Sequence, residues 1–203
     1  MGDLTLQQII MRVFAVGLIA SAHGFAIAAT SCAMGDCGPR LDERLKLNPL
    51  RHLDPVGGLL AVLFGVGWIR PMAVDPRRMR LGRAGLLAVV TSAACATIAI
   101  AVLLHAVRPF LLNQLPDTAS AACFIFIETV GRLCVLFTIF NLLPLPPLTG
   151  FHLLRAALPR IDPALSRTQP YFVVLLALLV ASGSVTRLLA SAESALERLV
   201  FAS

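Results

Sequence analysis

Long apolar runs separated by short polar stretches make up most of the chain. Three runs, residues 7–34, 84–107 and 119–148, each exceed the roughly 20 residues that a helix needs to cross a bilayer. A fourth run, residues 171–190, begins strongly apolar and weakens around residues 182–184. The pattern predicts four transmembrane helices.

A shorter apolar run over residues 56–69 contains four glycines, which weaken a helix. It suits a re-entrant or interfacial segment, or a short span. Residues 191–203 show helical amphipathic spacing at the end of the chain. We therefore predict an all-α integral membrane protein with about four to five transmembrane helices, and residues 1–203 forming a single membrane domain.

The composition excludes an ordinary soluble domain. Of the 203 residues, 58% are hydrophobic and 14% are charged, whereas soluble domains carry about 25% charged residues. A cleaved signal peptide is the alternative for the first run. Its basic start is missing, since the first charge is Asp3, and residues 26–28 are only a weak cleavage site.

The net charge of +6 is distributed unevenly between the apolar runs. Residues 35–83 hold nine basic side chains, and three more follow the run 119–148: Arg40, Arg44, Lys46, Arg51, Arg70, Arg77, Arg78, Arg80, Arg83, Arg155, Arg160 and Arg167. Four spans place all twelve on one side, which the positive-inside rule makes cytoplasmic. We expect a bacterial inner-membrane protein with its N-terminus outside. The basic loops lack interleaved aromatic residues for base stacking, so we expect no nucleic-acid partner.

Three stretches have residue patterns that the composition of a membrane helix alone does not explain. Residues 23–27 read His-Gly-Phe-Ala-Ile, and residues 48–57 read Asn-Pro-Leu-Arg-His-Leu-Asp-Pro-Val-Gly, followed by Gly-Trp-Ile-Arg-Pro at 67–71. Residues 141–150 read Asn-Leu-Leu-Pro-Leu-Pro-Pro-Leu-Thr-Gly. In this order and spacing they resemble the site-2 protease family of intramembrane zinc metallopeptidases. The resemblance implies a site sunk in the membrane that faces the cytoplasm.

The same resemblance places the family's catalytic residues on this chain. The family's His-Glu-x-x-His motif begins at His23, but Gly24 stands at the glutamate and Ile27 at the second histidine. Thr149 stands where the family has its third ligand, an aspartate. A catalytic zinc needs three protein ligands and a water. We therefore expect these positions to be degenerate, with no catalytic residue, no bound zinc and no other cofactor.

A replacement metal site is the alternative for the remaining ligand-type residues. His52 and His152, with Asp36 and Asp54, are the candidate ligands, although residue type alone fixes no geometry. The five cysteines, Cys32, Cys37, Cys95, Cys123 and Cys134, form no zinc-type pair with two residues between them. We interpret them as small buried thiols and expect no disulfide framework.

Residues around the second and third stretches are candidates for a cleft. In proteases of the family, the proline-rich kink is thought to hold an extended substrate beside the metal. We expect a partner to contact Asn48, Pro49, His52, Asp54, Asn141, Pro144, Pro146 and Pro147. Glu128 and Arg132 are four residues apart in the run 119–148, a spacing that predicts an intramembrane pair on one helix face.

These observations predict a site-2-protease-like pseudo-peptidase rather than an enzyme. In this interpretation the chain lies in the lipid bilayer and binds another membrane protein, or serves as an accessory subunit of a larger membrane complex. The alternative is an active intramembrane zinc metalloprotease with an atypical metal site.

Overall fold

The computed structural model describes residues 4–158 and 162–201, and this part of the chain is helical apart from turns and extended segments. The helices are α1 (Leu6–Ala33), α2 (Gly38–Leu41), α3 (Pro49–His52), α4 (Pro55–Phe64), α5 (Ala84–Gln114), α6 (Asp117–Asn141), α7 (Phe151–Ala157), α8 (Asp162–Ala181) and α9 (Ser184–Phe201). By length and composition, α1, α5 and α6 can each cross a membrane, and α8 with α9 forms a fourth span if the bent pair counts as one. The chain is an all-α integral membrane protein in a lipid bilayer.

The helix ends follow local sequence signals. Thr5 and Gln8 form a capping box at the start of α1, in which each side chain bonds the backbone of the other. Gly65 ends α4 in the left-handed region, with φ of 83°, where a side chain would be strained. Local chemistry therefore sets where the first membrane helix begins and where α4 ends.

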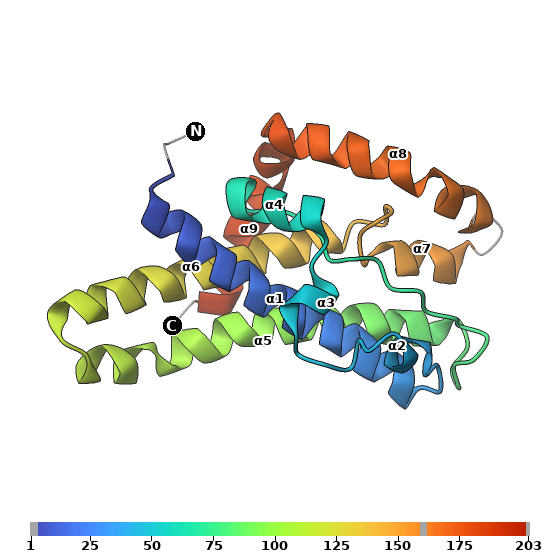
Figure 1. Ribbon diagram of the computed structural model, residues 1–203, viewed down its shortest axis with the longest axis horizontal. Helices are drawn as coiled ribbons and strands as arrows, with labels where there is room; N and C mark the ends of the chain where they lie inside the picture. Colours follow the sequence, from blue (N-terminus) through green and yellow to red (C-terminus); the bar gives the residue numbers. More distant parts are fainter. Residues whose placement is uncertain (1–3, 159–161, 202–203) are drawn as a thin grey trace.

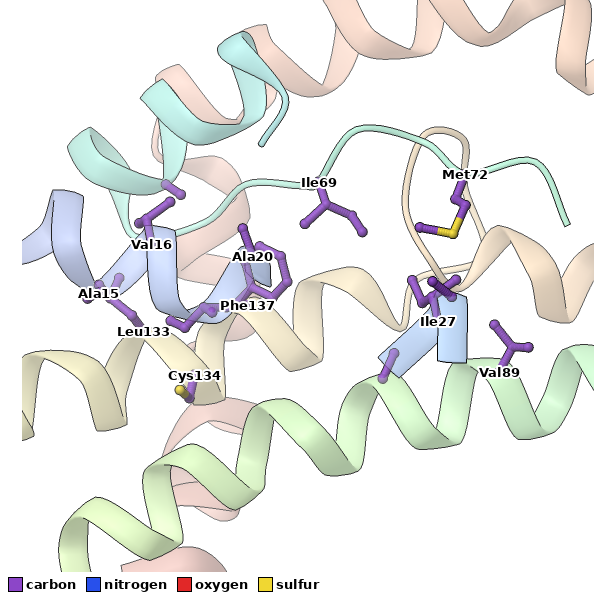
Figure 2. Packing of buried hydrophobic residues seen from close by; sticks show 14 of the residues in the cluster. Ala15, Val16, Ala20, Ile27, Ile69, Met72, Val89, Leu133, Cys134 and Phe137 are labelled. Carbon is purple, nitrogen blue, oxygen red and sulfur yellow. The ribbon is translucent and has the colours of Figure 1, made fainter. Parts of the chain in front are cut away.

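The core lies where α1 packs against α5 and α6. Helices α5 and α6 form an antiparallel hairpin, and α1 crosses it (Figure 1). Small and branched apolar side chains fill the contact, including Ala15, Ala20, Val89 and Leu133 (Figure 2). A second cluster surrounds Trp68 and Phe140, where α4, α8 and α9 meet α6. Many other apolar side chains of these helices are exposed, as expected for surfaces that face lipid.

The connections gather at the two ends of the bundle. The turn between α5 and α6 lies at one end, while α2, α7 and the turn that leads into α5 lie at the other (Figure 1). A hydrogen bond of 3.0 Å from Arg155 to the carbonyl of Val74 joins α7 to the arginine-rich segment that leads into α5. The four-span prediction requires this shared end. Which side of the membrane it faces stays a prediction.

The helix bounds differ from the predicted spans where tertiary contacts intervene. The helix that begins at Ala84 continues past residue 107 to Gln114, because Arg108 pairs with Glu128 at 2.7 Å and its charge is not left isolated. The predicted run 119–148 stops being helical at Asn141, before the prolines. The run 171–190 divides at residues 182–183 into two helices that meet at 75°.

The segment 56–69 is helical only in part. Its helix, α4, has ten residues and is about 15 Å long at the usual rise. A bilayer core is about 30 Å thick, so this helix alone cannot cross it. The chain then becomes extended, and Ile69 forms an antiparallel bridge with Leu53. The segment therefore folds back on itself, as a re-entrant element would.

Candidate functional site

His23 lies at the centre of a buried chain of hydrogen bonds that joins α1, α5 and the loop after α6. Its Nδ1 is 2.9 Å from Oγ1 of Thr97 on α5, and its Nε2 is 2.8 Å from Oγ1 of Thr149. Thr97 donates its own hydroxyl proton to the carbonyl of Ala93, also at 2.9 Å. Since a hydroxyl has one proton to give, Nδ1–H of His23 donates to Thr97, and the Thr149 hydroxyl donates to Nε2. Both ring nitrogens of a neutral imidazole are thus occupied.

The ring of His52 lies directly against the backbone of Gly24. A Cβ added at residue 24 would be 2.6 Å from Cγ of that ring, far too close for any side chain. Nε2 of His52 donates to the carbonyl of Lys46 at 2.9 Å. Burial lowers the pKa of His52, so the ring is neutral near pH 7. Its Nδ1 is a buried acceptor that has no partner within the described residues. Glycine at position 24 is what allows this contact.

The other polar residues of the second stretch fix the backbone. The Asn48 side chain accepts a hydrogen bond from the amide of Leu50 at 3.0 Å and caps α3. The Asp54 carboxylate accepts from the amides of Val56 and Gly57, at 3.0 and 2.9 Å, and caps α4. These two side chains thus hold their own loop, and neither lines the groove described below.

Asn141 joins the third stretch to the second. Its side-chain amide donates to the carbonyls of Gly67 and Phe137, both at 2.9 Å. Beyond it the chain turns irregularly over residues 142–150, including a cis peptide between Pro146 and Pro147. The kink predicted from the prolines is therefore present, and Asn141 positions it against the extended segment that follows α4.

A groove of about 340 Å³ opens beside Thr149. Its walls are Ile27 of α1, the extended segment 69–73, the loop 146–149 and the α7 residues 151–155, with Gln169 of α8 at one edge. Figure 2 shows Met72 pointing toward Ile27 across this space. Of the eight residues predicted for a cleft, Pro146 and Pro147 line the groove. The other six do not line it: Asn48, Pro49, His52, Asp54, Asn141 and Pro144. Ile27 and Thr149, predicted as degenerate catalytic positions, also line it. His23 is buried behind Thr149 and does not line the groove.

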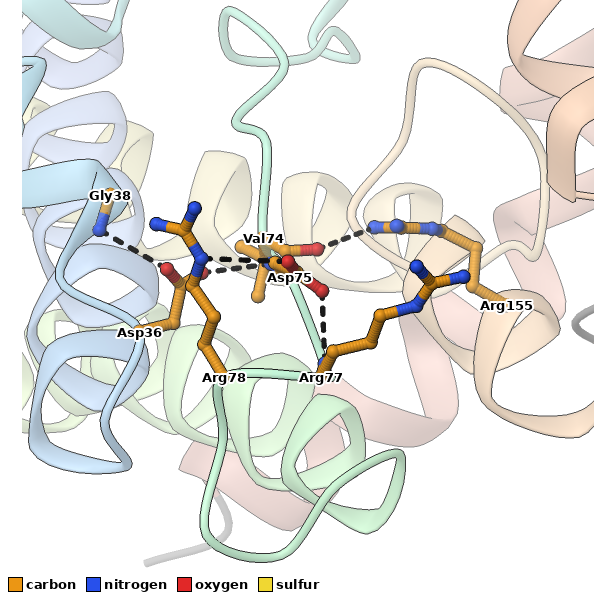
Figure 3. A network of polar contacts seen from close by, with 7 residues as sticks. All are labelled: Asp36, Gly38, Val74, Asp75, Arg77, Arg78 and Arg155. Atoms are coloured by element: carbon orange, nitrogen blue, oxygen red, sulfur yellow. Dashed lines mark hydrogen bonds and ion pairs between the residues drawn. The ribbon is translucent and has the colours of Figure 1, made fainter.

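A polar network anchors the extended wall of the groove to the end of α1. The Asp36 carboxylate, 2% exposed, accepts from the amides of Gly38 at 3.1 Å and Asp75 at 2.8 Å. The carbonyl of Val74 accepts from Arg155 (Figure 3). This wall is therefore tied to α1 on one side and to α7 on the other.

Glu128 and Arg132 pair with residues of other helices instead of with each other. Glu128 pairs with Arg108 of α5 at 2.7 Å, and Arg132 pairs with Glu193 of α9 at 2.9 Å. The two residues line a second cavity, of about 780 Å³, between α1, α5, α6 and α9. The i,i+4 spacing predicted a direct pair. The structure differs from this prediction because each of the two side chains pairs with an opposite charge on a neighbouring helix.

Comparison with known proteins supplies the family. The chain is 32% identical over 167 residues to a Bacillus subtilis (strain 168) protein named "Putative zinc metalloprotease YwhC". The alignment covers 78% of this chain and 74% of that protein. The chain belongs to the site-2 protease-like family. No protein-family model and no solved structure matches it.

Membership corrects one prediction. The sequence led us to expect that this chain is not an enzyme. The relative is named as a zinc metalloprotease, and this points to protease activity, so the expectation is wrong by that comparison.

The zinc ion that the family implies does not fit the residues at the expected position. Both nitrogens of His23 are engaged by hydroxyl groups, and Ile27 offers no donor atom. Within the described residues no three His, Cys, Asp or Glu side chains come together, whereas a catalytic zinc takes three protein ligands. The position of the family's general base is closed by the contact of Gly24 with His52.

The alternative ligands are likewise dispersed. Asp36 and Asp54 bind backbone amides, and His52 bonds the carbonyl of Lys46. His152 contacts Arg155 through Nδ1 at 3.2 Å. The structure therefore gives each of these residues a separate structural contact.

Sequence reasoning missed Thr97, Met72 and Arg155. Thr97 is a hydroxyl residue in a long apolar run, a signal that could have marked it as a buried partner for a histidine. Met72 and Arg155 carry no such signal, since their role depends on how the extended segment and α7 approach each other.

Proposed function

We propose that this membrane protein of the site-2 protease-like family binds an extended segment of another membrane polypeptide in the groove beside Thr149. The observation that carries the proposal is the unpaired backbone of the extended wall. The amides of Met72 and Ala73 make no hydrogen bond within the described part of the chain. Neither do the carbonyls of Pro71, Met72 and Ala73 accept one there. An extended peptide satisfies such groups by pairing with them as an added strand.

The opposite wall favours the same occupant. Pro146 and Pro147 have no amide hydrogens, so this side of the groove offers no backbone donor at these two positions to the carbonyls of the extended wall. Unpaired backbone groups cost several kcal/mol each in hydrocarbon, which is why irregular backbone in membranes lines cavities or is buried in protein. Ile27 and Met72 give the walls of the groove apolar side chains, and this suits the side chains of a membrane segment.

Photocrosslinking from inside the groove tests the proposal. A photoreactive phenylalanine analogue at Ala73 reports on the groove, and the same analogue at Leu178, 65% exposed on α8, reports on lipid-facing surface. We expect Ala73 to capture a defined set of membrane polypeptides that Leu178 does not. A blocking variant at the edge of the groove, Gln169→Trp, should reduce capture at Ala73 while leaving the products at Leu178 unchanged.

The outcomes separate the rival functions. Lipid adducts alone at Ala73 would reject the groove as a polypeptide site. Capture from Leu178 and other outer positions, with none from the groove, would favour an accessory subunit of a larger complex.

Proteolysis is the second candidate, and the name of the relative is the observation that favours it. Mass spectrometry of the polypeptide captured at Ala73 distinguishes binding from cutting. A captured chain that ends within the segment contacting the groove would support cleavage, and an intact chain would support binding alone.

A further inference from the structure

Two thiols approach each other closely where α1 gives way to α2. Cys32 lies in the last turn of α1 and Cys37 is the residue that precedes α2. Their Sγ atoms are 2.8 Å apart, within about 1 Å of the length of a disulfide bond. Cys37 is exposed and Cys32 is partly exposed, so the interpretation of these two cysteines as buried thiols is wrong. We propose that Cys32 and Cys37 are a reversible dithiol–disulfide pair, a modification site at this end of the bundle.

The fold holds the two thiols together through the residues between them. Gly35 adopts φ of 114°, a left-handed conformation that lets the chain turn back sharply after α1. Asp36 is buried and binds the amides of Gly38 and Asp75. The carbonyl of Met34 accepts from the amide of Arg80 at 2.8 Å. The turn is thus fixed from both sides, so bringing the sulfur atoms together costs little chain entropy.

Oxidation fits the pair better than metal binding does. A structural zinc requires four ligands, and a catalytic zinc three. Within the described residues no third His, Cys, Asp or Glu joins the two thiols as a metal cluster. Asp36, the nearest acidic residue in sequence, is turned toward backbone amides. Two accessible sulfur atoms without a further ligand are the arrangement of a thiol and its resolving partner.

The reaction needs a two-electron oxidant, and glutathione disulfide supplies one. The thiolate of the exposed Cys37 attacks one sulfur of glutathione disulfide, and one glutathione leaves as its thiolate. The thiolate of Cys32 then attacks Sγ of Cys37 in the mixed disulfide, and the second glutathione leaves. The protein loses two protons and two electrons, and two molecules of glutathione are formed.

The test uses the full chain, purified in detergent under reducing conditions. The protein is equilibrated at a series of ratios of reduced to oxidised glutathione, quenched with acid, denatured and alkylated. We expect Cys32 and Cys37 to lose alkylation together, with a mass decrease of two hydrogen atoms on the peptide that holds both. Cys95, Cys123 and Cys134 should still be alkylated. Addition of a reductant should restore both thiols.

Two variants locate the chemistry. Cys32→Ser removes the resolving thiol, so Cys37 should retain a glutathione adduct. Cys123→Ser is the matched control and should leave the transition of the pair unchanged. A lasting glutathione adduct on Cys37 in the unmodified chain would overturn the proposal. Independent alkylation of the two thiols across the whole series would overturn it as well.

Discussion

The hydroxyl of Thr149 donates a hydrogen bond to Nε2 of His23, across 2.8 Å and in a buried setting. In the family pattern, an aspartate stands at the position of Thr149 and a metal-binding histidine at the position of His23. Here the pair is neutral, and a hydroxyl proton occupies the lone pair that a metal would use. The contact ties the irregular loop beside the groove to the centre of α1, so its first role is structural.

Removal of the Thr149 hydroxyl should destabilise the protein. Thr149→Val keeps the shape of the side chain and leaves a buried nitrogen of His23 without its donor. We expect a loss of about 1–3 kcal/mol of unfolding free energy, measured as a lower melting temperature in detergent. Thr138→Val is the control, since the Thr138 hydroxyl is buried and has no partner within the described residues. Equal effects of the two variants would contradict the argument.

A methyl group at residue 24 should also destabilise the protein. Gly24→Ala drives a Cβ into the ring of His52, and overpacking of this kind costs about 1–3 kcal/mol. Gly17→Ala is matched within the same helix, because its Cβ would meet Pro49 at an ordinary 3.7 Å. We expect Gly17→Ala to be tolerated. In a double-mutant cycle, His52→Ala should recover much of the loss caused by Gly24→Ala, as neighbours in contact couple. Additive effects would show that the two residues do not touch.

The metal content of the purified chain should be well below one zinc per molecule. The engaged nitrogens of His23 and the apolar Ile27 are the reason. Elemental analysis by mass spectrometry after purification without chelator provides the measurement. A variant with Ile27→His and Thr149→Asp supplies two of the family's ligand types beside His23 and should bind more zinc. One tightly held zinc per unmodified chain would refute the prediction.

The basic end of the bundle should face the cytoplasm. In a variant without native cysteines, Arg78→Cys should react with an impermeant maleimide only after the cells are opened. Asp117→Cys, at the start of α6 and at the opposite end, should react in intact cells. The physical reason is the excess of arginine around Arg78, which the positive-inside rule retains inside. Labelling of the Arg78→Cys variant in intact cells would reverse the topology.

The sequence was sufficient for elements whose formation depends on local pattern. Long apolar runs predicted the membrane helices. Contacts between distant segments were beyond such reasoning. The partners of Glu128 and Arg132 lie 20 and 61 residues away along the chain. No spacing within one helix could have indicated them.

The candidate site shows the same division. The motif stretches indicated which residues would gather around His23, and Thr149 does meet it. They did not indicate that Asn48 and Asp54 are helix caps, although an Asn-Pro or Asp-Pro step favours a helix start. The extended wall at Met72 was missed because unpaired backbone has no signature in side-chain type.

The contact of Gly24 with His52 constrains the order in which substitutions can accumulate in this chain. Any larger residue at position 24 meets an imidazole ring that already fills the space. A change at position 52, or a displacement of the loop that carries it, must therefore come first. An identical substitution at position 24 would thus have one effect in a relative with an open loop and another effect here. We therefore expect the effects of substitutions at positions 24 and 52 to depend on each other.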